Sequence, residues 1–303
     1  MQSAWRVVDC SGLEGELSYV RGNLRVYRKS DGLTQNVPLE QLAVLLLGLK
    51  AKCSGGLLHQ LAEFGVSVMV CDWRQVPVAA FHSWSKTYTN VTARHTAQVT
   101  QSKPRRKSLW ARIVRAKVLG QAACLEGLGR ENFRVLSELA KSVRSGDPAN
   151  VEGQAARLYW RSLFGWDFRR NPGAREFGRN GQLDYAYMVL RGFAVKSVVS
   201  AGLAPMFGVN HHNRGNYFCL VDDLVEPFRP AVDFGVAQLD EFASVDNPQV
   251  RAGLVEAVNA QFRPGGFTIP VELDRFSQQV GLYFEGKVDG LRVPVFGCVD
   301  EAS

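Results

Sequence analysis

Five side chains, in three segments far apart in the sequence, have the chemistry of a site for one divalent metal ion. Glu152 and His211 lie in two separate segments, and Asp222, Asp223 and Glu226 lie together in a third. Carboxylate oxygens are the ligands that hard divalent cations prefer, and an imidazole suits Mn²⁺. We therefore expect the three segments to meet around one metal ion, and the basic character of the rest of the chain indicates a polyanionic substrate.

The acidic segment has helical spacing. Asp223 and Glu226 are three positions apart, so a helix places both on one face, near enough to serve one cation. Asp222 is rotated away from them by roughly 100°. Pro227 removes a backbone donor and its ring clashes with the carbonyl four residues earlier, so we expect the predicted helix 220–234 to kink there. The alternative is a solvated acidic face in a basic protein, and the spacing favours neither interpretation.

Glu152 falls near the start of a helix that we predict to begin at Pro148, with Asp147 as its N-cap. Its spacing places it on the same face as Tyr159 and Leu163. A carboxylate in line with an apolar stripe is partly buried and needs a partner. The alternative, which this residue taken alone favours, is a carboxylate that stabilises a helix N-terminus through the helix dipole.

His211 and His212 lie in a polar loop, residues 210–216, between two predicted helices. A histidine in a loop is more often a bystander than a ligand, so we expect only one of the two to matter. The remaining histidines are interpreted as bystanders: His59, His82 and His95.

A dense run of positive charge leads into the helix predicted for residues 109–126. It comprises Lys103, Arg105, Arg106, Lys107, Arg112, Arg115 and Lys117. Such a stripe can neutralise phosphates and release counterions, and Trp84 and Trp110 beside it could stack on bases. The alternative is a solvated helix face with Trp110 in the core. Because the positive charges are almost unopposed, we favour nucleic acid.

Composition narrows the class of protein. The 303 residues are enough for a large core and two domains, and 46% of them are hydrophobic. Lys and Arg number 36 against 29 Asp and Glu, a net charge of +7 that favours nucleic acid or an anionic surface as partner. Six scattered cysteines without a C-x-x-C pair argue against a zinc ribbon and a disulfide scaffold, and favour a reduced, cytoplasmic setting. We expect no signal peptide and no membrane-spanning segment.

The elements that must position these residues change character along the chain. Strand-like segments come first: residues 5–9, 17–20, 24–27, 42–47, 66–71 and 79–81, with one helix, 55–64, capped by Ser54. Helical patterns follow: 93–102, 109–126, 132–143, the helix from Pro148, 183–201, 220–234, 248–261 and 273–283, with 169–181 as a loop. We predict an α+β protein with a small β-rich domain, residues 1–84, and a larger all-α domain, residues 85–303.

Three motifs occur in a fixed order along the chain. They are Glu152-Gly153-x-x-Ala156-x-x-Tyr159-Trp160, Gly202-Leu203-x-Pro205-x-x-Gly208-x-x-His211 and Asp223-Leu224-x-Glu226-Pro227-Phe228-Arg229-Pro230. Together they resemble the CRISPR adaptation integrase family, metal-dependent DNA endonucleases/integrases that insert new spacers into CRISPR arrays. Leu183-x-Tyr185-x-Tyr187 resembles the family's Leu-Asn-Tyr-x-Tyr, with Asp184 in place of Asn, and Ala204 replaces a frequent Asp. The resemblance covers nearly the whole chain and is greatest to the type II branch.

The resemblance implies a β-sandwich-like N-terminal domain, an α-helical catalytic domain and a homodimer. It also implies two such dimers flanking a dimer of a small ferredoxin-like adaptation partner, a hetero-hexamer acting on double-stranded prespacer and repeat DNA without any membrane. Carried over by residue, it makes Glu152, His211 and Glu226 the ligands of Mg²⁺ or Mn²⁺. It makes Asp223 a further catalytic carboxylate and leaves His212 as a bystander.

The reaction expected from the resemblance is a transesterification, in which a DNA 3′-hydroxyl attacks a phosphodiester at the repeat border. Water in place of the hydroxyl would give nicking at the same site. Arg157, Arg214 and Arg229 are candidates for stabilising the transition-state charge, without spacing evidence for any of them. Two alternatives stay open: a general metal-dependent nuclease on branched DNA, which cleaves without joining, and a non-catalytic DNA- or RNA-binding protein.

Overall fold

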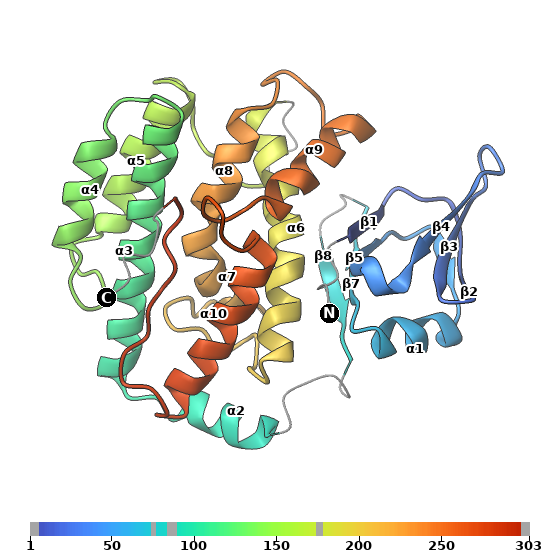
Figure 1. Ribbon diagram of the computed structural model, residues 1–303, viewed down its shortest axis with the longest axis horizontal. Coiled ribbons are helices and arrows are strands. Elements are labelled where there is room, and N and C mark those ends of the chain that lie inside the picture. Colours follow the sequence, from blue (N-terminus) through green and yellow to red (C-terminus); the bar gives the residue numbers. More distant parts are fainter. Residues whose placement is uncertain (1–5, 74–76, 84–89, 174–177, 298–303) are drawn as a thin grey trace.

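The computed structural model describes residues 6–73, 77–83, 90–173 and 178–297, and all structural statements below concern those residues. A β-rich N-terminal part lies at one end of the molecule and a helical part forms the rest (Figure 1). This confirms the predicted fold class. The domain boundary that we expect between residues 84 and 85 lies outside the described residues, as does Trp84.

The first of two four-stranded sheets has the order β1-β5-β7-β8. Its strands are β1 (Arg6–Cys10), β5 (Leu42–Leu47), β7 (Ser67–Cys71) and β8 (Pro77–Phe81). β5 pairs in parallel with both β1 and β7, whereas β7 and β8 are antiparallel. Because β5 lies inside this sheet and is covered on both faces, its sequence is an unbroken apolar run rather than an alternating one.

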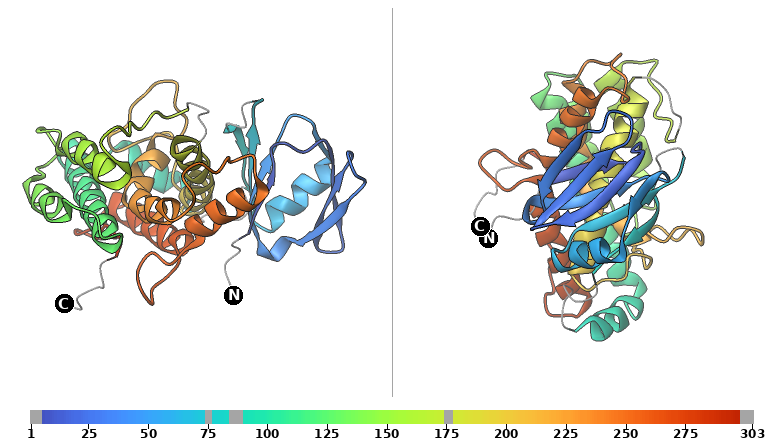
Figure 2. Two further views of the ribbon diagram at one scale, coloured as in Figure 1. Left: turned by 90° about the horizontal axis from the view of Figure 1, so that it is seen from above. Right: turned by 90° about the vertical axis from the view of Figure 1, so that its right-hand side faces the viewer.

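The second sheet has the order β4-β3-β2-β6 and faces away from the helical part (Figure 2). Its strands are β2 (Gly15–Val20), β3 (Asn23–Arg28), β4 (Thr34–Pro38) and β6 (Ala51–Cys53). β4 and β6 were not predicted from the sequence. Both are edge strands, β4 is mostly polar and β6 has three residues, so neither carries a readable apolar alternation.

Helix α1 (Gly55–Glu63) completes the core of the β-rich part. Its Leu57 and Leu61 are buried with Leu17 and Leu24 of the second sheet and Leu45 of the first. The Ser54 hydroxyl accepts a hydrogen bond from the Leu57 amide at 3.2 Å, which confirms the predicted N-cap. A short 3₁₀ turn, η1 (Leu39–Gln41), precedes β5.

The helical part is built around two long helices with buried residues on most of their circumference, α3 (Lys103–Gly127) and α6 (Arg179–Ser200). Around them lie α2 (Val91–Val99), α4 (Phe133–Ser142), α5 (Val151–Phe164), α7 (Cys219–Val225), η2 (Glu226–Phe228), α8 (Arg229–Ala237), α9 (Pro248–Asn259) and α10 (Ile269–Phe284). Outside the named strands, the described residues of this part contain one isolated bridge, Gln261 with Thr268. No helix among the described residues has both the length and the hydropathy required to cross a membrane.

Helix α6 also packs against the first sheet, and Gly192 permits this close approach. A Cβ atom at Gly192 would lie 3.0 Å from Val44 Cγ1 and 3.1 Å from Met69 Sδ. Side chains of β5 and β7 therefore share a core with the helices. The Tyr185 hydroxyl donates to Asp9 Oδ2 at 2.9 Å and fastens α6 to β1 as well.

Several predicted helix starts were displaced. The helix predicted from residue 109 begins earlier, because Lys103-Pro104 forms the first turn of α3, where a proline is tolerated, and Ser102 is its N-cap. Asp147 was expected to cap a helix beginning at Pro148. Helix α5 instead begins at Val151, and Asn150 is its N-cap.

Asp147 still serves the start of α5, because its carboxylate accepts the amides of Val151 at 2.9 Å and Glu152 at 3.0 Å. The kink expected at Pro227 is confirmed: the 3₁₀ turn η2 separates α7 from α8. The predicted loop 169–181 ends early, since α6 begins at Arg179.

Candidate active site

Two carboxylates from distant segments meet on one ammonium group. Lys117 of α3 donates from Nζ to Glu152 Oε1 of α5 at 2.6 Å, and the same Nζ lies 2.6 Å from Glu226 Oε2 of η2. The contact with Glu226 is an ion pair, and this buried oxygen has no other polar partner among the described residues. Burial lowers the pKa of Lys117, but the two carboxylates outweigh this and raise it. The first and third predicted segments therefore do meet.

Arg229 holds the other oxygen of Glu226, because its Nε donates to Oε1 at 2.9 Å. Burial would raise the pKa of Glu226, but Arg229 and Lys117 lower it to about 2, so this buried carboxyl is ionised. Arg229 was one of three arginines considered for the site. Arg157 and Arg214 are exposed and form no hydrogen bond or ion pair with the described residues.

His211 reaches the site from the loop between α6 and α7, residues 201–218, here called the histidine loop. Its Nδ1 lies 2.7 Å from Asp223 Oδ1. The hydrogen bond to Asp223 raises the pKa of His211, against the effect of burial. A carboxylate on Nδ1 fixes the proton there and leaves Nε2 of a neutral ring free to bind a cation. The ring also packs edge-on against Trp110, with 5.9 Å between centroids and 82° between planes.

Asp223 is fully buried and both of its oxygens are engaged by the histidine loop. Besides the His211 ring, it accepts the backbone amides of Val209, Asn210 at 3.0 Å and His211 at 3.2 Å. Gly208 also packs tightly here, since an added Cβ would lie 2.9 Å from Asp223 Oδ2 and 2.3 Å from the His211 carbonyl oxygen. In this position Asp223 orients the imidazole rather than facing solvent itself.

Asp222 points to the other side of α7, as the helical rotation predicts. It accepts from Arg191 Nη2 at 2.7 Å and from Asn216 Nδ2 at 2.7 Å. His212, the neighbour of His211, is exposed. Neither side chain contacts Lys117 or its two carboxylates.

Glu152, Glu226 and His211 are suitable ligands for a hard divalent cation, although in the structure Lys117 bridges the two carboxylates. Among the residues that the structure describes, no three His, Cys, Asp or Glu side chains are gathered closely enough to hold a metal. The ammonium group of Lys117 nevertheless occupies the place between Glu152 and Glu226 where a divalent cation would bind. His211 lies close enough to Glu226 for each to influence the pKa of the other. Two carboxylates and one imidazole nitrogen suit Mg²⁺ or Mn²⁺ once Lys117 gives way.

A buried network behind Arg229 escaped the sequence analysis. Asp233 accepts hydrogen bonds from Tyr159 Oη at 2.9 Å and from the Tyr187 hydroxyl. The guanidinium of Arg229 lies 4.4 Å from the centre of the Tyr187 ring. Burial raises the pKa of Asp233 to about 7, against the two hydroxyl donors. The signal available in the sequence was the pair of tyrosines in the motifs, each of which needs a partner when buried.

The basic stretch is divided between internal contacts and surface. Arg105 Nη2 donates to the Tyr283 carbonyl at 2.6 Å and stacks 4.2 Å above the Tyr283 ring, and Arg112 Nη1 donates to the Leu291 carbonyl at 3.0 Å. Lys103 and Lys107 are exposed and Arg106 is half-buried. The suggestion that Trp110 stacks on bases is wrong, because the central position of α3 leaves this indole only 4% exposed.

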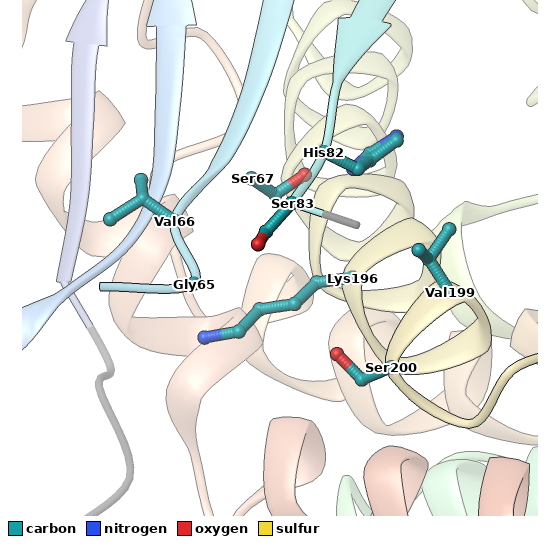
Figure 3. Close-up of a pocket in the computed structure, with 8 residues that line it drawn as sticks. All are labelled: Gly65, Val66, Ser67, His82, Ser83, Lys196, Val199 and Ser200. Carbon is teal, nitrogen blue, oxygen red and sulfur yellow. The ribbon is translucent and has the colours of Figure 1, made fainter. Parts of the chain in front are cut away.

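A separate small pocket lies where the first sheet meets α6 (Figure 3). Lys196, Val199 and Ser200 of α6 face Ser67 and His82 across it. Its cavity of about 20 Å³ has room for one water molecule. It contains none of the candidate site residues and has no part in the site.

Comparison with known proteins of similar sequence shows the family to which this chain belongs. The model of the family described as CRISPR associated protein Cas1 matches residues 13–241. A CRISPR-associated endonuclease Cas1 from Neisseria meningitidis serogroup C (strain 8013) is 32% identical over 268 residues, which cover 87% of this chain and 84% of that protein. The chain belongs to the Cas1 family. A Cas1 endonuclease from Pyrobaculum aerophilum is 30% identical over 269 residues, covering 80% of this chain and 88% of that protein. Family membership makes this chain a nuclease/integrase of CRISPR adaptation, as the motif resemblance predicted.

Several solved structures share the fold. A casposase bound to integration product has a TM-score of 0.76 at 17% identity, covering 97% of this chain and 95% of that chain. A Cas1 protein from Thermotoga maritima has a TM-score of 0.75 at 15% identity, covering 97% and 100%. A Cas6-RT-Cas1–Cas2 complex has a TM-score of 0.71 at 18% identity, covering 100% of this chain and 37% of that chain. At these identities the likeness concerns the fold alone, and it agrees with a β-rich N-terminal part followed by a helical part.

Proposed function

We propose that this chain inserts spacer DNA into a CRISPR array by metal-dependent attack of a DNA 3′-hydroxyl on a phosphodiester. The observation that carries the proposal is the convergence of Glu152 and Glu226 on one cationic group beside the oriented ring of His211. Two carboxylates so close together, one partly and one almost fully buried, are costly unless a positive charge lies between them. This is the environment that a divalent cation requires.

In the proposed mechanism, Glu152, Glu226 and His211 would hold Mg²⁺ or Mn²⁺. The bound ion would polarise a phosphoryl oxygen, lower the pKa of the attacking hydroxyl and stabilise the leaving oxygen. Asp223 keeps the proton of His211 on Nδ1 and fixes the histidine loop, which makes it a positioning residue. Arg229 keeps Glu226 in place through its second oxygen. A water molecule entering instead of the 3′-hydroxyl would produce a nick.

The proposal includes the partners expected from the resemblance: double-stranded prespacer and repeat DNA, a second copy of this chain, and a dimer of a small ferredoxin-like protein. Support comes from structures of similar fold, one a casposase bound to integration product and another a Cas6-RT-Cas1–Cas2 complex. On this chain, Lys103, Arg106 and Lys107 are the members of the basic stretch whose side chains are tied neither to a backbone carbonyl nor to a carboxylate of the described residues. They are our candidates for phosphate contacts.

The test is a joining assay with a duplex carrying a 3′-hydroxyl, supercoiled plasmid and Mn²⁺ or Mg²⁺. Wild type is expected to give plasmid-linked fragment, whereas Glu152→Ala and His211→Ala should abolish joining and leave DNA binding mostly intact. Glu138→Gln is the matched control, because Glu138 is an exposed carboxylate whose partner is the exposed Lys141. Wild-type joining by either site variant would contradict the assignment of the site.

The same assay separates the alternatives. Nicking without joining, even with the small partner present, would support a general nuclease on branched DNA. Binding with neither activity would support a non-catalytic DNA-binding protein.

A further inference from the structure

We propose that Lys117 is an internal counter-ion for the two metal carboxylates, and that a divalent cation binds by displacing its ammonium group. This inference rests on the proposed metal-dependent function, and it assigns a role to a residue outside the three matched motifs. In the sequence, Lys117 was only one member of a basic stripe.

The geometry distinguishes Lys117 from the surface cations. Its Nζ lies 2.6 Å from an oxygen of each carboxylate, and its side chain is only 13% exposed. It extends from α3, whereas the carboxylates come from α5 and η2, so the contact joins three separate elements. Without a positive charge between them, Glu152 and Glu226 would repel each other and separate. Lys117 therefore keeps the site assembled in the absence of metal.

The ammonium group and a metal compete because they need the same oxygens. A hard cation coordinates carboxylate oxygens at about 2.0–2.6 Å, so it would take the position that Nζ now holds. Lys117 can leave because its charge sits on a flexible four-carbon stem. Glu226 stays in place when this happens, since Arg229 retains its other oxygen at 2.9 Å. Displacement thus exchanges one cation for another without dismantling the site.

The test measures Mn²⁺ binding without DNA, by the electron paramagnetic resonance signal of free Mn²⁺, in wild type and Lys117→Met. Removing the competing charge should lower the Kd for Mn²⁺ by about tenfold or more, because a unit charge at this distance contributes several times RT. Lys141→Met is the matched control. Its lysine pairs with Glu138 at 2.7 Å, is 71% exposed and is absent from the site, so its Kd should stay within about twofold of wild type.

Melting temperatures give a second readout. Metal-free Lys117→Met should melt below wild type, since two carboxylates lose their shared cation, and Mn²⁺ should raise its melting temperature more than that of wild type. A role of Lys117 in packing alone would lower the melting temperature without tightening metal binding. Lys117→Gln, which retains a polar head group, is measured in parallel, and the same direction of change in Kd is expected.

The outcomes separate this inference from the proposed function. If Glu152→Gln abolishes Mn²⁺ binding and both Lys117 variants bind Mn²⁺ like wild type or more weakly, the counter-ion role is wrong and the metal site stands. If neither wild type nor any Lys117 variant binds Mn²⁺, both are wrong. Should both variants fail to fold, acylation of lysines in wild type, read by mass spectrometry, decides the matter. Mn²⁺ should increase modification at Lys117 and leave Lys141 unchanged, and no increase at Lys117 would overturn the inference.

Discussion

Replacing Asp223 by Asn removes one charge and turns one hydrogen-bond acceptor into a donor at the base of the histidine loop. In wild type, Oδ2 accepts the amides of Val209 and Asn210, and Oδ1 accepts the amide and ring Nδ1 of His211. An asparagine of the same shape can satisfy only one of these two pairs, and its NH₂ group faces two N–H donors at the other.

The expected loss of stability follows from the number of hydrogen bonds that Asp223→Asn removes. A hydrogen bond to a charged group contributes about 1.5–3 kcal/mol, so losing two of them costs about 3–6 kcal/mol at most. The histidine loop can detach locally from α7, in which case part of this free energy appears as misplacement of His211 rather than as global unfolding. We therefore expect a lower free energy of unfolding together with weaker binding of Mn²⁺.

The assay is urea unfolding combined with Mn²⁺ titration, and Asp222→Asn is the neighbouring control. Asp222 has the same helix context but holds Arg191 and Asn216 on the outer side of α7. Because that ion pair is partly exposed, its loss should cost about 0–1 kcal/mol and leave Mn²⁺ affinity unchanged. An Asp223→Asn protein as stable as Asp222→Asn, with wild-type Mn²⁺ affinity, would refute the positioning role of Asp223.

Three further predictions concern the surroundings of the site. Since burial raises the pKa of Asp233 from 3.8 to about 7, the native state binds this proton more tightly than the unfolded chain, and stability should fall as pH rises from 4 to 7. That loss is about 4 kcal/mol at most, and it should vanish in Asp233→Asn when unfolding is followed across this pH range. Neutralising Arg106 and Lys107 should weaken DNA binding and flatten its dependence on salt. By contrast, Arg105→Gln should mainly lower the melting temperature, because Arg105 is bonded to a carbonyl of α10. Equal salt slopes in wild type and the Arg106/Lys107 variant would remove these two residues from the DNA interface. Gly208→Ala should reduce Mn²⁺ affinity at least tenfold, about 1.4 kcal/mol, because its Cβ would press on the histidine loop, and unchanged affinity would show that the loop adapts.

Much of the fold is readable from the sequence because its longer elements have strong periodicity. Leu42–Leu47 is an uninterrupted apolar run and was predicted as a buried strand at the bounds it has. Pro227 predicted the break between α7 and α8, because a ring without an N–H cannot continue a helix. The start of α5 was misplaced, since both Asp147 and Asn150 are suitable cap residues and only the folded chain shows that Asn150 is the N-cap.

The site was predictable in its residue types but not in its contacts. The motifs around Glu152, His211 and Glu226 identify candidates for one centre, and the helical spacing separates Asp222 from Asp223. Nothing in the local pattern distinguishes Lys117 from the other positive residues near it, because its partners lie on α5 and η2 and are adjacent only after folding. Long-range ion pairs of this kind depend on how the helices pack.

Locating Mn²⁺ in a crystal of this protein through its anomalous scattering tests the proposed metal site most directly. We expect one peak bound by Glu152, Glu226 and His211 Nε2, at about 2.0–2.4 Å from each ligand atom, with the ammonium group of Lys117 displaced from between the two carboxylates. A peak on Asp222 or elsewhere on the surface, with the Lys117 bridge intact at saturating Mn²⁺, would contradict it.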